Sequence, residues 1–169
     1  MRGFILFLVS FLLMAGSVAT LCSTGCPFRW TPFRGKCYLL QPQKLNYETA
    51  EQNCRSLSTR RKEAHLVSIT SKEELDFVQQ LVTVAWDNFD PPLSWKEIWI
   101  GLRVGASAET TRWEDGSPVA FSYFYGYTSP AVPYSSSPRC TLFTISHDTW
   151  KAWHDCNARL PTVCKMQRD

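Results

Sequence analysis

The stretch IWIGL, residues 98–102, divides the chain into two halves with different patterns. It is a short apolar run bounded by polar residues, which predicts a buried strand. Helical periodicity precedes it, and short strands and turns follow it. Because large rings dominate small cores, we expect Trp99, Ile100 and Leu102 to be core and turn elements rather than ligand contacts. Helices followed by strands favour a single α+β domain.

Two helices are predicted upstream of this strand. The first lies in NYETAEQNCRSL, where Asn46 is a suitable N-cap. The second lies in SKEELDFVQQLVTV, where Ser71 and Glu74 form a capping box. The apolar residues at helical spacing are Tyr47, Ala50, Cys54 and Leu57 in the first helix, and Leu75, Val78 and Val82 in the second. Between the helices, HLVSI predicts a strand or extended link over Leu66–Ile69.

The second half of the chain predicts short strands joined by turns. The further strands are expected over residues 111–116, 140–146 and 162–166. Asp115-Gly116 is a turn signal, and the Pro-rich stretch DNFDPPLSWKE lies just before IWIGL. Residues 119–139 are rich in Tyr, Ser and Pro, which predicts one long loop without regular structure.

Residues 1–19 have the pattern of a secretory signal peptide. Arg2 is followed by the apolar run Phe4–Ala15 and then by small residues, so we expect cleavage after Ala19 or Thr20. The run is shorter than the roughly 20 apolar residues that span a bilayer. The sequence therefore predicts a secreted, extracellular protein with no membrane span, made of a short segment at 20–25 and one domain at 26–165.

The charge of the chain is close to balanced. Lys and Arg number 18 against 15 Asp and Glu, a net charge of +3, and removal of Arg2 leaves 17 − 15 = +2. The basic residues are scattered apart from Arg60-Arg61-Lys62, which we interpret as a solvated loop rather than a nucleic-acid patch. No nucleic-acid partner is expected.

The seven cysteines all follow the signal segment: Cys22, Cys26, Cys37, Cys54, Cys140, Cys156 and Cys164. In an oxidising compartment such residues form structural disulfides, and an odd number leaves one over. Spacing alone does not fix the pairing. Cys22 and Cys26 have no second pair at zinc-ligand spacing, so a zinc site is not expected.

Six segments, in this order, resemble a C-type lectin-like domain between Cys26 and Lys165. They are GCPFRWTPFRGKCY, the helix with Cys54, HLVSI before a capped helix, IWIGLRV, RWEDGSPVAFSYF, and Cys156-x7-Cys164 with a preceding tryptophan. The resemblance implies a compact domain whose termini meet. It also implies two helices that flank two small antiparallel sheets, and a long loop that carries the binding site.

The resemblance also implies a disulfide pairing: Cys26–Cys37, Cys54–Cys164 and Cys140–Cys156. Cys22 is then unpaired near the start of the mature chain, and we expect it to link two chains as a disulfide-bonded dimer. Two alternatives stay open: a small thiol caps Cys22, or Cys22 replaces Cys26 as the partner of Cys37.

Sugar-binding members of this family hold one calcium ion in the long loop. The ligands come from a Glu-Pro-Asn or Gln-Pro-Asp tripeptide, a further acid and a Trp-Asn-Asp motif, because calcium takes about 6 to 8 oxygen ligands. Here WHDC keeps Trp153 and Asp155 but has His154 in place of Asn, and Val119–Arg139 contains no Asp, Glu, Asn or Gln. We interpret Asp155 as a remnant and expect no metal, with Asp155 and Asp148 as the candidates for a residual Ca²⁺ site.

The long loop offers aromatic side chains instead. Phe121 and Phe124 are candidate core residues. The candidate ligand residues are Tyr123, Tyr125, Tyr127 and Tyr134, because Tyr with Ser and Gly is typical of recognition surfaces. An equal alternative is that these rings only pack the loop onto itself.

No catalytic arrangement is recognised in the sequence: the three histidines lack partners at ligand spacing and no serine lies in a nucleophile elbow. The sequence predicts a non-enzymatic binding protein that recognises a protein or surface ligand through this loop without the usual calcium and sugar site. The alternative is a carbohydrate-binding lectin of innate defence, calcium-dependent or unconventional.

Overall fold

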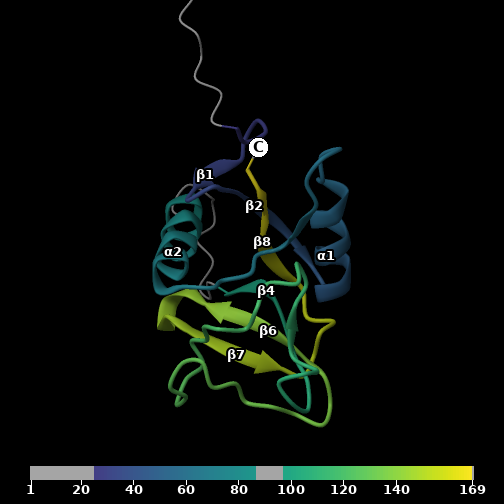
Figure 1. The fold of residues 1–169 in the computed structure, drawn as a ribbon, viewed down its shortest axis with the longest axis vertical. Helices are drawn as coiled ribbons and strands as arrows, with labels where there is room; N and C mark the ends of the chain where they lie inside the picture. The colour runs from purple at the N-terminus through teal and green to yellow at the C-terminus, as the bar shows by residue number, and fades with distance from the viewer. Residues whose placement is uncertain (1–24, 87–96, 169) are drawn as a thin grey trace, which may run out of the picture.

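The computed structural model describes residues 25–86 and 97–168, so the expected signal segment, Cys22 and most of DNFDPPLSWKE lie outside the described residues. Within these described residues the chain forms two helices and eight strands (Figure 1). The elements in chain order are β1 Thr31–Phe33, β2 Lys36–Leu45, α1 Tyr47–Ser56, β3 Ala64–Leu66, α2 Lys72–Trp86, β4 Glu97–Val104, β5 Arg112–Trp113, β6 Arg139–Thr144, the 3-10 turn η1 Ile145–His147, β7 Thr149–Trp153 and β8 Leu160–Gln167.

The strands form two antiparallel groups that join into one sheet. The order is β1-β2-β8-β4-β6-β7, with β3 also paired to β8 and β5 to β4. The groups meet at one parallel pair, Trp99↔Thr162, where the Thr162 hydroxyl donates to the Trp99 carbonyl at 3.0 Å. The two small sheets implied by the resemblance are thus continuous. In Figure 1 helices α1 and α2 stand on either side of β2 and β8.

The first helix begins where the sequence predicts. The side chain of Asn46 accepts a hydrogen bond from the Thr49 amide at 2.9 Å, which confirms it as the N-cap of α1. Tyr47, Ala50 and Cys54 are fully buried on one face of the helix. The apolar stripe therefore decides which side of α1 packs against the sheet.

At the start of the second helix, only one of the two hydrogen bonds of the predicted capping box forms. The Ser71 hydroxyl accepts from the Glu74 amide at 3.2 Å, as a cap should. The Glu74 carboxylate does not close the predicted box but accepts from the amide and hydroxyl of Thr70, each at 2.8 Å. Glu74 is only 4% exposed, because its side chain turns into the interior. The capping-box prediction was wrong for this half of the motif.

Several strand boundaries differ from the predictions. Residues 111–116 contain only the two-residue strand β5, because the chain turns at Gly116, where φ is +72°. Residues 140–146 leave the sheet after Thr144 and enter η1. Of the predicted extended segment Leu66–Ile69, only Leu66 belongs to a strand. Strands β2 and β7, which the apolar pattern does not show, complete the sheet.

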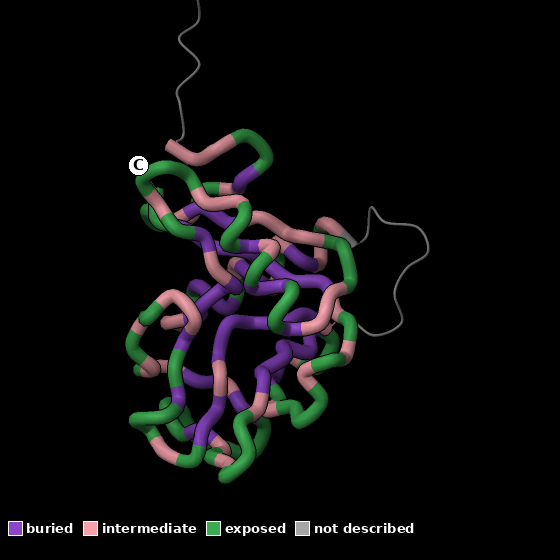
Figure 2. The backbone as a smooth tube through the Cα atoms, turned by 90° about the vertical axis from the view of Figure 1, so that its right-hand side faces the viewer, coloured by how far each residue is buried: buried purple, intermediate pink, exposed green. Residues whose placement is uncertain are grey.

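The core is built around β4. Trp99, Ile100 and Leu102 are fully buried, as predicted. Gly101 lies between them and permits close packing, since a Cβ at this position would lie 2.7 Å from the Leu66 carbonyl oxygen. Figure 2 shows buried backbone running through the centre of the molecule and exposed positions gathered in the connecting segments.

Three disulfides link elements of the described part of the chain. Cys54–Cys164 joins α1 to β8 across 110 residues, Cys140–Cys156 joins β6 to the segment after β7, and Cys26–Cys37 closes the N-terminal hairpin. This is the pairing implied by the family resemblance. The two ends of the domain also meet, because Lys36 in β2 pairs with Gln167 in β8.

A buried ion cluster fastens α2 to β8. The Lys165 ammonium donates to Glu74 Oε1 at 2.8 Å and to the Ser68 carbonyl at 2.7 Å, and it lies 3.9 Å from Asp115 Oδ2. The Tyr38 hydroxyl also donates to Glu74 Oε1, at 2.6 Å. Burial raises the pKa of Glu74, but the charge and hydrogen bond of Lys165 outweigh burial and bring the pKa to about 2. Burial lowers the pKa of Lys165, and Glu74 only partly offsets this effect.

Candidate functional site

The long loop, residues 119–139, is anchored on β7. Phe124 forms a parallel bridge with Trp150, and the Trp150 amide donates to the Tyr123 carbonyl at 2.9 Å. The Thr149 hydroxyl donates to the same carbonyl at 3.2 Å. The long loop is therefore attached to the sheet at an internal position, in addition to its two ends.

Trp150 is the centre of the aromatic cluster below the loop. Its ring makes edge-to-face contacts with Trp113 and Phe124 at 5.6 Å and with Phe121 at 5.8 Å between centroids. Phe124 is 5% exposed, which places it in the core as predicted, whereas Phe121 is only partly buried. Edge-to-face pairs of this kind add about 0.5 to 1.5 kcal/mol each beyond the buried area. The cluster makes the base of the loop rigid.

An open groove of 460 Å³ lies between the loop and η1. Its aromatic wall consists of Tyr123, Tyr125 and Tyr127 together with Phe121. Tyr125 is 86% exposed and Tyr127 is 49% exposed, whereas Tyr123 is half-buried and stacks on Phe121 at 6.2 Å. The structure thus brings three of the four predicted tyrosines together and presents two of them to solvent.

The opposite side of the groove is polar. Asp148 follows η1 in the left-handed conformation, with φ +48° and ψ +52°, and its Oδ2 accepts weakly from the Tyr123 hydroxyl at 3.4 Å. Its Oδ1 is buried and has no hydrogen-bond partner within the described part of the chain. The Lys72 ammonium lies 5.3 Å from the centroid of the Tyr123 ring. Sequence reasoning missed Lys72 and His147, because only tertiary structure brings α2 and η1 beside the loop.

Tyr134 does not belong to this groove. It lines a separate cavity of 290 Å³ with Pro130 and Val132, and it is 50% exposed. The predicted set of four tyrosines therefore divides into a group of three and one residue apart.

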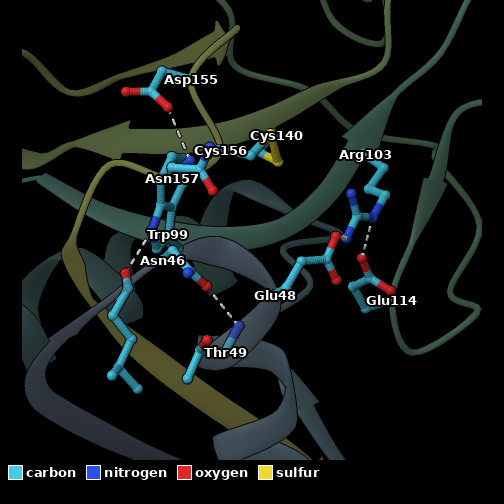
Figure 3. Close-up of a disulfide and its surroundings, with 11 residues drawn as sticks. Asn46, Glu48, Thr49, Trp99, Arg103, Glu114, Cys140, Asp155, Cys156 and Asn157 are labelled. Atoms are coloured by element: carbon cyan, nitrogen blue, oxygen red, sulfur yellow. Dashed lines mark hydrogen bonds and ion pairs between the residues drawn. A yellow bond between two sulfur atoms is a disulfide. The ribbon is translucent and has the colours of Figure 1, made fainter.

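The two candidate calcium residues lie apart. Asp148 precedes β7 and Asp155 follows it, and the five residues of this strand span about 16 Å. Calcium ligands lie about 2.3 to 2.6 Å from the ion, so the two carboxylates cannot share one ion. Asp155 Oδ1 instead accepts from the Asn157 amide at 3.0 Å, beside the Cys140–Cys156 disulfide (Figure 3).

The tryptophan before Asp155 is not the buried one. Trp153 is 37% exposed and its ring lies 5.2 Å from that of His154, whereas Trp150 is 1% exposed in the core. The residues after Trp150 are Lys151 and Ala152, which offer no anionic or amide oxygen. Among the described residues, no group of three or more His, Cys, Asp or Glu side chains is arranged to hold a metal ion. The residues present do not fit the calcium site of sugar-binding family members.

A larger cavity of 680 Å³ surrounds Arg103 on β4. The guanidinium bonds to Glu48 and, at 2.7 Å, to Glu114 (Figure 3). It also lies over the Tyr47 ring, 4.6 Å from the ring centroid. Burial lowers the pKa of Arg103, but the hydrogen bonds and charges of its neighbours raise it overall. Because two carboxylates already satisfy the guanidinium, we interpret this arrangement as a structural link between α1 and β4.

The remaining histidines have structural neighbours. His65 Nδ1 lies 2.7 Å from Glu51 Oε1, and the other oxygen of Glu51 accepts from the Leu66 amide at 2.9 Å. His147 Nδ1 lies 3.1 Å from the Ser146 hydroxyl at the exposed end of η1. Neither pair forms the base-and-nucleophile arrangement of a hydrolase.

Comparison with known proteins agrees with this architecture. The family model for the lectin C-type domain matches residues 43–166. The chain is 35% identical over 162 residues to Snaclec 3 of Sistrurus catenatus edwardsii, covering 94% of this chain and 92% of that protein. It is 30% identical over 150 residues to lymphocyte antigen 75 of Mus musculus, covering 89% of this chain but only 8% of that much longer protein.

A solved structure shows the same fold. The crystal structure of CEL-IV superimposes with a TM-score of 0.65 at 26% sequence identity, covering 83% of this chain and 92% of that chain. Within residues 25–86 and 97–168, no helix combines the length and apolar character needed to cross a bilayer.

Proposed function

Since this chain belongs to the family of proteins with a lectin C-type domain, we propose that it is a binding protein that recognises a protein or surface ligand through its long loop without calcium. The observation that carries the proposal is the groove formed by Tyr123, Tyr125 and Tyr127. Tyr125 is held at 86% exposure on a loop whose base is packed against Trp150. Rigid, exposed tyrosines supply contact area at low entropic cost.

The oxygen atoms near the groove support binding without calcium. Residues 119–139 contain no side-chain carboxylate or amide, and Asp148 and Asp155 stand at opposite ends of β7. A hard cation that requires about 6 to 8 oxygen ligands would have to rely on backbone and water. We therefore expect that ligand binding survives chelation.

The test compares two matched variants in the presence of a chelator. Wild type, Tyr125→Ser/Tyr127→Ser and Tyr134→Ser are screened against arrays of extracellular protein domains and of glycans. We expect a protein ligand that loses at least about tenfold affinity with the double variant, since tyrosines are enriched among interface hot spots and a tenfold loss requires only about 0.7 kcal/mol from each ring. Tyr134→Ser removes an equally exposed ring outside the groove and should change affinity less than about twofold. Equal losses in both variants would contradict the proposal.

A glycan is the second candidate, and the polar side of the groove favours it. Asp148 lines the groove and is half-buried, and its Oδ2 has only the weak 3.4 Å contact with Tyr123, so the carboxylate offers an acceptor to a sugar hydroxyl. The exposed ring of Tyr125 offers a face on which a sugar can stack. In the same screen, this function predicts a glycan signal that a free monosaccharide competes away. Asp148→Asn should weaken such binding while leaving a protein complex of the tyrosines largely intact.

Calcium itself is tested directly. Because a ligand that binds only the folded state raises its stability, Ca²⁺ titration by calorimetry and by thermal midpoint should give no heat and no shift in midpoint. A clear heat and a rising midpoint would favour the calcium-dependent lectin of the alternative.

We also propose that the protein is secreted, has no catalytic activity, and forms a disulfide-linked dimer through Cys22. The signal pattern at residues 1–19 and the odd number of cysteines support the first and last of these. Non-reducing gels of wild type should show a dimer that Cys22→Ser abolishes. A monomer in both samples would refute the dimer.

A further inference from the structure

The last turn of α1 and the loop that joins it to β3 carry a concentrated positive charge. From Gln52 to Lys62 the chain contains four cations and no acid; the cations are Arg55, Arg60, Arg61 and Lys62. Arg55, Arg60 and Arg61 are exposed, and Lys62 is half-buried. We name this surface, made of these four residues, the basic loop.

The cations of the basic loop have no acidic partner among the residues that the structure describes. Several basic side chains elsewhere are paired with acids, as in Arg34–Glu73 and Lys72–Asp76. Within the part of the chain that the structure describes, no ion pair involves Arg55, Arg60, Arg61 or Lys62. Other unpaired and exposed cations, such as Lys44, Arg112 and Arg159, stand alone in the sequence.

The backbone of the basic loop is held in place. The Thr59 hydroxyl accepts from the Lys62 amide at 3.0 Å and from the Arg61 amide at 3.3 Å, and the Thr59 amide donates to the Lys62 carbonyl at 2.9 Å. The Ser58 hydroxyl accepts from the Ala64 amide at 2.9 Å, which ties the loop to β3. These bonds hold the backbone from which the cations project, so less backbone conformational entropy is lost when a ligand binds.

A further cation extends the charged surface beyond the basic loop. Strands β3 and β8 are antiparallel, with Ala64 opposite Met166. The residues after Met166 therefore run alongside those before Ala64, which brings the exposed Arg168 next to the basic loop. Positive charge therefore comes from two separate segments on one side of the molecule. This arrangement suits an extended polyanion better than a single small anion.

The cavity next to the basic loop supports the same conclusion. It has a volume of 310 Å³ and is lined by Arg61 and Lys62, but also by the acids Glu63 and Asp115. Lys165 in its wall is already bound to Glu74. Since both signs of charge line the cavity, it does not select an anion, and the exposed cations outside it are the contact surface.

We propose that the basic loop binds a sulfated polysaccharide chain. The polymer carries closely spaced anions that match unpaired cations, and it belongs to the extracellular space in which we expect this protein. The basic loop lies at the end of α1 remote from its N-cap, and in Figure 1 this end points away from the long loop, which lies at the opposite, lower end of the molecule. The proposal does not depend on the tyrosine groove, so one molecule could hold a polysaccharide and a groove ligand together.

The experiment uses the mature protein and heparin as the probe. Two variants each remove three exposed, unpaired cations: Arg55→Gln/Arg60→Gln/Arg61→Gln in the basic loop, and Lys44→Gln/Arg112→Gln/Arg159→Gln elsewhere. At physiological salt we expect the loop variant to bind at least about tenfold more weakly, and the control less than about twofold more weakly. The slope of log affinity against log salt should fall by about 2 to 3 in the loop variant only, because fewer counterions are released.

Four outcomes overturn the proposal. The first two are that wild type fails to bind heparin at physiological salt, or that the loop variant binds as tightly as wild type. The third is an equal loss of affinity in both variants, which would mean that binding depends only on net charge. The fourth is tighter binding to vesicles with phosphatidylserine, or to duplex DNA, than to heparin. The exposed glutamines leave every backbone bond of Thr59 and Ser58 in place, so an unchanged thermal midpoint shows that a loss of binding is not a loss of folding.

Discussion

The region around α1, α2 and β8 and the region around the long loop are held by different forces. The first contains the Cys54–Cys164 disulfide and the buried contact between Lys165 and Glu74. The long loop is held by rings packed around Trp150 and by few hydrogen bonds to β7. Strong covalent and ionic contacts secure the scaffold, which leaves the loop free to present side chains that contribute little to stability.

The largest expected effect is on the covalent link of the scaffold. Cys54→Ala/Cys164→Ala should lower the free energy of unfolding by about 4.8 kcal/mol, because the bridge closes a loop of 110 residues in the unfolded chain. The matched control, Cys26→Ala/Cys37→Ala, opens a bridge across only 11 residues and should cost about 2.8 kcal/mol. Urea unfolding at pH 7 measures both. Equal losses would show that chain entropy is not the source of the difference.

The second effect is on the ionic link. Lys165→Met should cost about 3 kcal/mol, because it removes the buried counter-charge of Glu74 and leaves only the more exposed Lys36 ammonium, at 3.4 Å from Oε1. Adding Glu74→Gln to that variant removes the stranded charge and should restore part of the stability. Lys72→Met, which breaks an exposed pair with Asp76, serves as the control and should cost less than about 0.5 kcal/mol. If the double variant were less stable than Lys165→Met, the cluster would not act through charge.

Acid should weaken the same link. The pKa of Glu74 in the folded protein is about 2, below its ordinary value, so its contribution is present above about pH 4.5 and is lost as the pH falls toward 2. We expect wild type to lose about 3 kcal/mol over this range through this group. In Glu74→Gln the loss should be correspondingly shallower. Urea titrations between pH 7 and 2 compare the two, and parallel curves would contradict the assignment.

The smallest effect on stability is expected in the long loop. Tyr125→Ser should change the free energy of unfolding by less than about 0.5 kcal/mol, since its ring is 86% exposed. Affinity for the groove ligand should nevertheless fall, which would separate recognition from stability. A decrease in the free energy of unfolding above about 1 kcal/mol would show that Tyr125 packs the loop, and the two regions would then not differ in this respect.

Local signals could be predicted because their partners lie close in sequence. Asn46 caps α1 through the amide three residues later, and Tyr47, Ala50 and Cys54 share one face by helical spacing. Glu74 shows the limit of this reasoning. Its position relative to Ser71 predicts a capping box, but the partner that decides its conformation, Lys165, is 91 residues away.

The candidate site was only partly predictable for the same reason. Trp150 and Trp153 are three residues apart, and only packing decides that the first is the core of the loop and the second faces solvent. Tyr123, Tyr125 and Tyr127 alternate in sequence, yet Tyr123 is half-buried against Phe121. From the sequence, Asp148 is a candidate calcium ligand together with Asp155. The structure places it in the groove with Tyr123.

The sequence by itself determined the α+β domain, its two helices, the resemblance that implied its disulfides, and the lack of side-chain carboxylates and amides in the long loop. These features depend on residue type and spacing, which are properties of the chain alone. Only the tertiary structure decided which tyrosines share a groove and that Asp148 and Lys72 join them. It also decided that, among the described residues, the cations of the basic loop have no acidic partner. Such contacts join residues far apart in sequence, and packing and solvent exposure decide them.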